Sequence, residues 1–491
     1  MRLAAKSLSL LCLFGSLLAH AQISSFKHIV VIFQENRTPD NLFQGLCVPP
    51  FGNSNSCSTT PTGNQFNIQT SNWLDKTAPN GVTQPVAIPL ANTYDLSHAN
   101  SAWKKQCDKD ANGHCLMDGS ALVGCSPASE CAKFPHPQFR FADYTQPPHN
   151  LDPYLTLATQ YGWANYMFQT NEGPSFPAHQ FIFGATSAPN TADDAAGTFA
   201  AENMGGTGTG AGCIAQPLVT VQLIDKNGFE DPNMKIFPCF EHSTVADLLD
   251  PLNISWTYYT SGASSIWTAP DAINHICVPS GGKCTGSDWT KGAANGFVDV
   301  KSADVLTDIA NCKLPRLSWV IPTGQNSDHA KTNTGGGPAW VASVVNAIGN
   351  SWTNSNHTCD YWGNNSNDST AIFITWDDWG GWYDHEAPTI LASPESGYQY
   401  GFRVPLIVVS AYTPTQTNNF RHDFGSIIKY IELNFGIQEG ALNFADQRAA
   451  NDLHLFFNLN GTPRTFQTIP SKKNAKYFVN DKTPPTDPDD D

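Results

Sequence analysis

Charged residues are scarce in this chain, and basic residues are the scarcer kind. Only 14% of its 491 residues are charged, with 27 Lys and Arg against 43 Asp and Glu, for a formal net charge of −16. This deficit argues against a nucleic-acid partner, because such binding needs a basic face that displaces counterions from phosphates. It also argues against electrostatic docking on anionic lipid. The 40% of hydrophobic residues, with 38 Gly and 34 Pro, indicates a globular, acidic and loop-rich protein.

Long hydrophobic runs are absent apart from one short run at the amino end. Arg2 and Lys6 precede an apolar stretch at residues 8–18, and a small-residue cleavage signal follows at residues 19–21. This layout is typical of a signal peptide, and the stretch is too short to span a bilayer. We therefore expect residues 1–21 to be removed and the protein to be exported, either secreted or periplasmic, without a transmembrane segment.

No CxxC pair occurs among the cysteines, which disfavours a structural zinc site. Of the 13 Cys, 12 would remain after the expected cleavage, an even number suited to an oxidising compartment. We predict disulfides between neighbours along the chain, although the sequence alone leaves the connectivity open. The predicted pairs are Cys47–Cys57, Cys107–Cys115, Cys125–Cys131, Cys213–Cys239, Cys277–Cys284 and Cys312–Cys359.

Short, continuous apolar runs rich in β-branched residues indicate buried strands. They occur at residues 27–33, 254–260, 317–321, 371–376 and 404–410. Helical patterns lie between and after them, at residues 245–252, 339–348 and 426–435. This alternation predicts an α/β fold with a mostly parallel central sheet and helices on both faces. Such sheets carry their chemistry just beyond the carboxyl ends of the strands.

One large domain is expected over residues 22–480, because no linker interrupts the alternation of strands and helices. A stretch at about residues 47–138 is rich in Asn, Thr, Pro, Gly and Cys and has little periodicity. We interpret it as a disulfide-stapled loop insertion on the core. Residues 481–491 are expected to form an acidic, flexible tail.

Two of the predicted strands end in pairs of oxygen donors. Glu35 and Asn36 follow the first strand, and Asp377 and Asp378 follow the strand at residues 371–376. Adjacent carboxylates repel each other unless a cation neutralises them, and carboxylate and amide oxygens suit hard divalent ions. If the two strands are neighbours, the four donors converge on one cation. Each pair taken alone could equally be a polar turn or a helix cap.

A serine and three histidines could complete a catalytic site. Ser175 lies in a proline-flanked turn that can project its hydroxyl, and it needs a base or a metal to become a nucleophile. Its surroundings lack the GxSxG pattern of the α/β-hydrolases. His98, His275 and His329 could bind phosphoryl oxygens or protonate a leaving group, since imidazole titrates near neutrality. Taken by itself, Ser175 is more simply interpreted as a turn residue. Each histidine by itself is more simply interpreted as a structural residue.

The string HIVVIFQENRTPD at residues 28–40 resembles the opening of the phosphoesterase family that includes bacterial phospholipases C and a secreted acid phosphatase. That family looks like a one-metal branch of the alkaline-phosphatase superfamily. The likeness continues in order over nearly the whole mature chain. Its further motifs lie at residues 95–98, 173–175, 254–256, 266–275, 327–329, 336–345, 375–385, 401–405 and 424–432.

The resemblance implies a hydrolase that acts on phosphoric ester bonds through a phosphoserine intermediate. It implies one divalent metal ion (Ca, Mg, Zn, Mn or Fe) bound by Glu35, Asn36, Asp377, Asp378 and Ser175. Ser175 would also be the nucleophile. The residues that would surround the phosphate are His98, His275 and His329. The chain departs from the family at residues 38–39, which are often Ser-Phe, and at Trp379, where an acidic-His step is common.

The expected substrate is a small phosphate ester or a phospholipid. The acidic net charge and Ser rather than Thr at position 175 favour a phosphomonoesterase like the acid phosphatase. A phospholipase C that acts on phosphodiesters is the alternative. A secreted binding protein without catalysis is a third possibility, against which the intact Ser175 and ligand set argue. A sulfatase-like activity is disfavoured because those enzymes need a modified Cys or Ser in a different motif.

Overall fold

The computed structural model describes residues 26–290, 296–298, 301–363, 368–391 and 398–486 of the chain. The predicted signal peptide lies outside the described residues, as do residues 487–491 of the predicted tail. Within the described ranges, no helix has the combination of length and hydropathy needed to cross a membrane.

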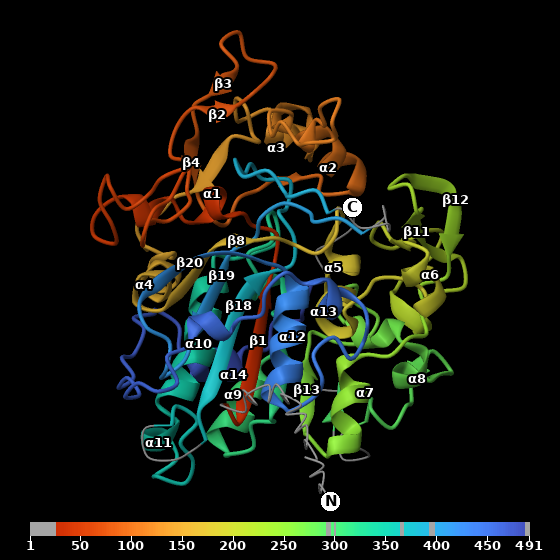
Figure 1. Ribbon diagram of the computed structural model, residues 1–491, viewed down its shortest axis with the longest axis vertical. Helices are drawn as coiled ribbons and strands as arrows, with labels where there is room; N and C mark the ends of the chain where they lie inside the picture. Colours follow the sequence, from red (N-terminus) through yellow and green to blue (C-terminus); the bar gives the residue numbers. More distant parts are fainter. Residues whose placement is uncertain (1–25, 291–295, 299–300, 364–367, 392–397, 487–491) are drawn as a thin grey trace, which may run out of the picture.

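One large sheet forms the centre of the molecule (Figure 1). Five of its seven neighbouring strand pairs are parallel, and β19 alone runs antiparallel to both of its neighbours. The prediction of a mostly parallel sheet is therefore confirmed. In spatial order the strands are β16 (Gly296–Phe297), β13 (Trp256–Tyr259), β17 (Leu317–Val320), β1 (His28–Gln34), β18 (Thr370–Trp376), β19 (Leu406–Val409), β8 (Gly162–Met167) and β20 (Gln416–His422).

All five predicted strands occur, as β1, β13, β17, β18 and β19. Two longer strands of this central sheet escaped prediction. In β8 the run GWANYM mixes small and polar residues with aromatic ones, and the edge strand β20 (QTNNFRH) is mostly polar. An edge strand carries few apolar residues when one of its sides faces solvent, so it lacks the run that marks a buried strand.

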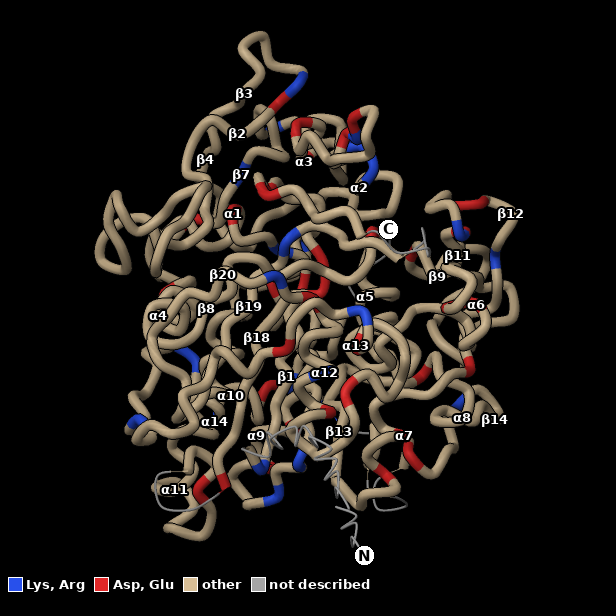
Figure 2. The backbone as a smooth tube through the Cα atoms, viewed as in Figure 1, with Lys and Arg blue, Asp and Glu red and all other residues tan. Residues whose placement is uncertain are grey.

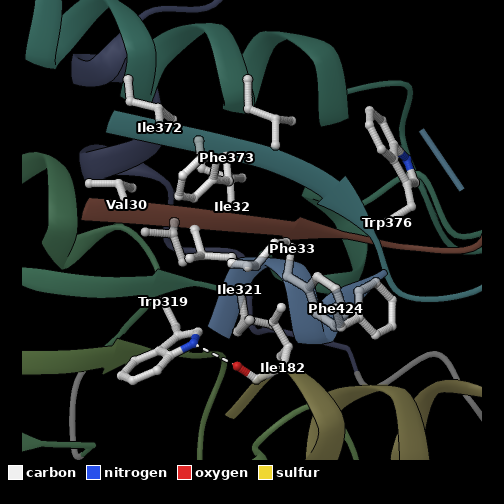
Figure 3. Close-up of a cluster of buried hydrophobic side chains, with 14 of the residues drawn as sticks. Val30, Ile32, Phe33, Ile182, Trp319, Ile321, Ile372, Phe373, Trp376 and Phe424 are labelled. Atoms are coloured by element: carbon white, nitrogen blue, oxygen red, sulfur yellow. Dashed lines mark hydrogen bonds between the residues drawn. The ribbon is translucent and has the colours of Figure 1, made fainter. Parts of the chain in front are cut away.

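The core lies around β1 and β18, in which every residue is buried. Figure 3 shows side chains of both strands packed with Ile182, Trp319 and Phe424. The indole N–H of Trp319 donates to the carbonyl of Ile182 at 3.0 Å and so ties β17 to α5 (Ser175–Gly184). Strands β1 and β18 are therefore held firmly by the packed core around them.

Helices cover both faces of the sheet, as predicted. One group consists of α4 (Asp152–Gln160), α9 (Asp304–Ala310), α10 (Gly337–Gly349) and α14 (Ala475–Asn480), in mutual contact. The other group consists of α5, α7 (Val245–Leu249), α12 (Phe424–Asn434) and α13 (Ala445–Arg448). The three helical patterns of the sequence correspond to α7, α10 and α12.

A loop-rich excursion stands beyond the carboxyl end of β1, at the top of Figure 1. It begins after α1 (Pro39–Leu42) and η1 (Gln44–Cys47) and returns through β7 (Arg140–Ala142). Between them lie β2 (Trp73–Leu74), β3 (Val82–Thr83), β4 (Val86–Ile88), β5 (Asp95–Leu96), α2 (Asn100–Cys107), η2 (Ser120–Leu122), β6 (Cys125–Ser126) and α3 (Ala128–Cys131). This excursion matches the character of the predicted insertion, while the domain limits at 22 and 480 stay predictions.

All six predicted disulfides are present, with Cα–Cα distances of 4.4 to 6.0 Å. Three of them lie inside the predicted insertion. Pairing of close neighbours along the chain was therefore the right interpretation.

The start of the predicted tail, residues 481–486, runs beside η6 (Gly324–Asn326). There the side-chain amide of Gln325 donates to the carbonyl of Pro484 at 2.6 Å.

Candidate metal and nucleophile site

The register of two central strands brings the predicted ligands together. Gln34 of β1 pairs with Trp376 of β18, so the next residues leave the sheet side by side. The backbone N–H of Asp377 donates to the carbonyl of Gln34 at 2.9 Å. The backbone N–H of Asn36 donates to Asp377 Oδ1 at 2.8 Å. The two strands are thus neighbours, as convergence of the four donors requires.

Asn36 is held in a conformation that aims its amide inward. Its φ of 59° lies in the left-handed region, which Asn tolerates better than most residues. Its Nδ2 donates to His98 Nε2 at 3.1 Å, because His98 Nδ1 donates to the carbonyl of Leu96 at 2.9 Å and leaves Nε2 as the acceptor. Asn36 Oδ1 is buried without a hydrogen-bond partner among the described residues. It is therefore available to a cation.

Three carboxylates share this buried space: Glu35, Asp377 and Asp378 are all fully buried. Figure 2 shows several acidic positions gathered above β18 and β1 in the middle of the view. Within the described part of the chain, Asp377 Oδ2 has no hydrogen-bond partner. Ligand atoms of Glu35, Asp377 and His179 lie within 4.8 Å of one another. Buried like charges at such spacing need a compensating cation, and carboxylate and amide oxygens suit a divalent ion.

The predicted nucleophile lies at the first position of α5. Pro174 precedes it in an extended conformation, and Ser175 is fully buried. Its hydroxyl donates to Asp378 Oδ2 at 3.4 Å, and the next backbone N–H, of Phe176, donates to Asn203 Oδ1 at 2.9 Å. The amino end of a helix carries partial positive charge, which favours an anion such as a phosphoryl group at this position.

His329 lies beside this group. Its ring centroid is 5.7 Å from that of His98 and 6.2 Å from that of Trp267. Its Nδ1 donates to the carbonyl of Ala330 at 2.8 Å, which leaves Nε2 as an acceptor in a neutral ring.

The residue before His329 anchors its loop in the core. Asp328 Oδ2 accepts hydrogen bonds from Tyr154 at 2.7 Å and from the Trp376 indole at 3.0 Å. Burial raises the pKa of Asp328 to about 6. The guanidinium of Arg37 donates to the Asp328 carbonyl at 2.7 and 2.9 Å, and burial lowers its pKa to about 10. These contacts hold His329 in place.

His275 lies outside this group. Its Nδ1 is 2.6 Å from Glu241 Oε1, and its Nε2 is 3.2 Å from Asp247 Oδ1 of α7. The hydrogen bond to Asp247 and the further contact with Glu241 raise the pKa of His275 to about 9, and 32% of its side chain is exposed. The two carboxylates thus hold the imidazole on the surface between α7 and α8 (Asn274–Cys277). Its place beside the phosphate is what the family resemblance implies.

The structure adds one buried residue that sequence reasoning missed, His179. It lies four residues after Ser175 on α5, and its Nε2 is 3.2 Å from Glu35 Oε1. A helix that begins at Ser175 places residue i+4 on the same face. Recognising 175–184 as a helix would therefore have identified it.

Trp379, where the chain departs from the pattern of the family it resembles, forms part of the wall of the site. Trp379 is fully buried, and its indole N–H donates to Gln106 Oε1 at 2.9 Å. Its ring meets that of His98 edge-on, with centroids 6.4 Å apart. Trp379 thus places an apolar ring at a position where the family that the chain resembles often has an acidic residue followed by His.

A second cluster of ligand-type side chains, formed by Asp40, Asp384 and His385, lies against the guanidinium group of Arg403. Arg403 donates to both oxygens of Asp384, at 2.8 and 3.0 Å. His385 Nδ1 lies 2.7 Å from Asp40 Oδ2. Burial would lower the pKa of His385, but the charge of Asp40 outweighs it and raises the pKa. We interpret this cluster as an ion-pair network.

Two cavities flank the loop that precedes Ser175. One, of about 430 Å³, reaches Glu172 and is lined by apolar side chains that include Trp103, Phe229 and Ile390 and by polar ones that include Lys104 and Lys109. The other, of about 310 Å³, touches Pro174 and contains Glu202 and Glu230.

Comparison with known proteins gives one match over most of the chain. The model of the Phosphoesterase family matches residues 26–438. The chain is 24% identical over 274 residues to Phospholipase C B of Mycobacterium tuberculosis, covering 50% of this chain and 48% of that protein. It is 29% identical over 197 residues to Non-hemolytic phospholipase C of Burkholderia pseudomallei, covering 34% and 26% respectively. The match thus spans about half or less of these relatives' lengths.

Among solved structures, one from Vibrio parahaemolyticus is described as a protein in the alkaline phosphatase superfamily. It aligns with a TM-score of 0.28 and 11% identity, covering 58% of this chain and 60% of that one.

Proposed function

Because the chain belongs to the Phosphoesterase family, we propose that it hydrolyses phosphoric esters through a phosphoserine formed on Ser175. The observation that carries the proposal is the 3.4 Å hydrogen bond from the Ser175 hydroxyl to Asp378. It joins the amino end of α5 to the carboxyl end of β18, at a point where three buried carboxylates meet.

The residues fit a divalent metal ion. The proposed ligands are Glu35, Asn36, Asp377, Asp378 and Ser175. When bound, such an ion would supply positive charge for the phosphoryl oxygens and lower the pKa of the serine hydroxyl. The partnerless buried oxygens of Asn36 and Asp377 among the described residues support this fit. Ca, Mg, Zn, Mn and Fe all bind such donors.

The side chains of the site can carry the protons of the reaction. Asp378 accepts the proton of Ser175 while Oγ forms its bond to phosphorus and the bond from phosphorus to the alcohol oxygen breaks. We assign to His329 the proton that the departing alkoxide takes up. Water then attacks the phosphoserine and gives its proton to the same imidazole. Phosphate leaves, and Ser175 Oγ recovers its proton from Asp378.

His98 has a positioning role in this proposal. Its Nε2 accepts a hydrogen bond from Asn36 Nδ2. This bond orients the Asn36 side chain so that Oδ1 faces the other proposed metal ligands. The phosphate contact that the resemblance implies for His275 is left out, because Glu241 and Asp247 hold that ring elsewhere.

The first candidate substrate is a phosphomonoester, so that the protein would be acid-phosphatase-like. The acidic net charge and the serine nucleophile support this choice. The second candidate is a phospholipid diester. It is favoured by the partly apolar cavity that reaches Glu172, three residues before Ser175, and by the names of the relatives.

We propose export as the setting of this activity. Six disulfides support it, because such bonds form and persist in oxidising compartments and are rare in reducing ones.

The test is a parallel assay of p-nitrophenyl phosphate, bis(p-nitrophenyl) phosphate and phosphatidylcholine. Wild type is compared with Ser175→Ala and with a matched control, Ser343→Ala, whose buried hydroxyl donates to Trp340 on α10. We expect Ser175→Ala to lose about three or more powers of ten in turnover, as other nucleophile deletions do. The control should keep wild-type rates. Wild-type turnover by Ser175→Ala would overturn the covalent mechanism, and the preferred ester decides between the two substrates.

A further inference from the structure

A buried histidine outside the predicted ligand set faces the same centre as Ser175. His179 is fully buried on α5, one helical turn after Ser175. Its Nε2 lies 3.2 Å from Glu35 Oε1, and Asp377 completes a group of three ligand atoms within 4.8 Å. Two adjacent ligands held about 2.0 to 2.1 Å from one ion lie at roughly this separation when they subtend about 100°. The spacing is therefore that of neighbouring ligands.

The hydrogen bonds around the ring determine its tautomer. The Tyr258 hydroxyl donates its one proton to the carbonyl of Trp267 at 2.8 Å. The same oxygen lies 3.3 Å from His179 Nδ1 and can only accept there, so Nδ1 carries a proton. In a neutral ring Nε2 then presents a lone pair, beside the acceptor oxygen of Glu35. Two acceptor atoms 3.2 Å apart need either a proton or a metal ion between them.

Neighbouring rings keep the imidazole in this orientation. Phe33 meets it edge-on with centroids 4.8 Å apart, and Trp267 lies nearly parallel to it at 6.3 Å. Metal-bound histidines usually donate their second ring N–H to a neighbouring acceptor, which fixes tautomer and orientation. The Tyr258 oxygen is such an acceptor.

We propose that His179 Nε2 is a ligand of the same metal ion as Glu35 and Asp377. One helix thus presents both the nucleophilic oxygen and a nitrogen ligand, from positions i and i+4. A nitrogen donor favours Zn or Fe over Ca and Mg, which prefer oxygen. This inference deepens the proposed function by naming a ligand and a class of metal, and it rests on that function only for the presence of an ion.

The first experiment measures metal binding rather than turnover. Wild type, His179→Gln and a matched control, His28→Gln, are stripped with a chelator and titrated separately with Zn²⁺, Co²⁺ and Ca²⁺. His28 is also buried on β1, but at the opposite end from Glu35, where Nδ1 bonds to Pro315. We expect His179→Gln to lose about 100-fold or more in affinity for Zn²⁺ and Co²⁺. Mutating a residue that only hydrogen-bonds to a metal ligand already lowers metal affinity by about 10- to 100-fold. The control should bind like wild type.

X-ray absorption of the zinc-loaded wild type gives a result that needs no stable variant. An imidazole in the first shell produces its own scattering pattern, which we expect in wild type. Tyr258→Phe, which removes the acceptor of Nδ1–H together with the hydrogen bond to the Trp267 carbonyl, should weaken zinc binding about 10-fold. Absence of imidazole scattering, or equal zinc affinity of wild type and His179→Gln, would overturn the proposal, because His179 would then be a cationic partner of Glu35.

These measurements separate the inference from the proposed function. A protein that binds zinc through His179 but cleaves no ester would refute the proposed function alone. An active phosphoesterase whose zinc lacks an imidazole would refute the ligand assignment alone.

Discussion

Gln34 and Trp376 lie opposite each other as the last residues of β1 and β18. From this register the chain delivers Glu35 and Asp377 to one point, where the Asn36 N–H donates to Asp377 Oδ1 at 2.8 Å. A slip of one residue in either strand would turn these side chains to the other face of the sheet. The site therefore depends on the backbone geometry at the ends of these two strands.

Gly380→Ala should disrupt the site through its backbone. Gly380 has a φ of +61°, and a Cβ there would lie 2.4 Å from the carbonyl oxygen of Asn36 and 2.6 Å from its Cβ. Asn36 cannot withdraw without breaking its bond to Asp377. We expect weaker metal binding and a loss of stability. The loss should exceed the cost of about 1–2 kcal/mol that any residue with a Cβ incurs at positive φ. Chelator competition and urea denaturation measure both.

The matched control is Gly281→Ala. Gly281 has a φ of +56°, and a Cβ there meets nothing within 4 Å. It should show the conformational cost alone and keep wild-type metal affinity. Equal behaviour of the two variants would mean that the close approach of Gly380 to Asn36 does not shape the site.

Metal removal should destabilise the protein, because it leaves buried carboxylates without their counter-charge. Stripped wild type should melt at lower temperature and regain stability on titration, by about 2.7 kcal/mol at 100 times Kd. Asp377→Asn should weaken this response and melt higher than wild type when stripped, since one buried like charge is gone. Asp308→Asn, whose native carboxylate accepts from Tyr259, serves as control and should respond like wild type. An unchanged response of Asp377→Asn would refute Asp377 as a ligand.

Stability should fall with rising pH through Glu202. Burial and then the charge of Glu230 raise the pKa of Glu202 from 4.5 to about 9. Between these values the folded protein holds a proton that the unfolded chain releases. The stabilisation is therefore complete below pH 4.5 and is lost as the pH rises to about 9, with a slope of up to about 1.4 kcal/mol per pH unit.

The variant Glu202→Gln tests this dependence, because its amide stays neutral throughout. Urea denaturation at pH 5, 7 and 9 should show the variant gaining stability relative to wild type as the pH rises. Glu439→Gln, at a position with 48% of its side chain exposed, should follow wild type. Parallel curves for wild type and Glu202→Gln would contradict the raised pKa.

The disulfides should differ in their contribution to stability. Cys312 and Cys359 are 47 residues apart, whereas Cys125 and Cys131 are 6 apart. The chain-entropy model assigns about 4 kcal/mol to the long loop and about 2 kcal/mol to the short one. Replacing each pair by serine should therefore lower the free energy of unfolding more for Cys312/Cys359. The opposite order in urea denaturation would contradict this account.

Much of the fold was predictable because its signals are local. The apolar runs of β1, β13, β17, β18 and β19 are continuous, since both faces of these strands are buried. The disulfides join neighbours along the chain, so adjacency was enough. The strands β8 and β20 escaped because mixed or polar residues leave no such run.

The amino-acid sequence by itself determined which residues could bind a cation, since Glu35, Asn36, Asp377 and Asp378 follow strands that their own composition marks. Only the tertiary structure decided which distant groups join them. The packing of α5 places His179 against Glu35. His275 instead forms its contacts with Glu241 and Asp247. The physical reason is that order along a chain carries no distance, whereas strand register and helix packing do.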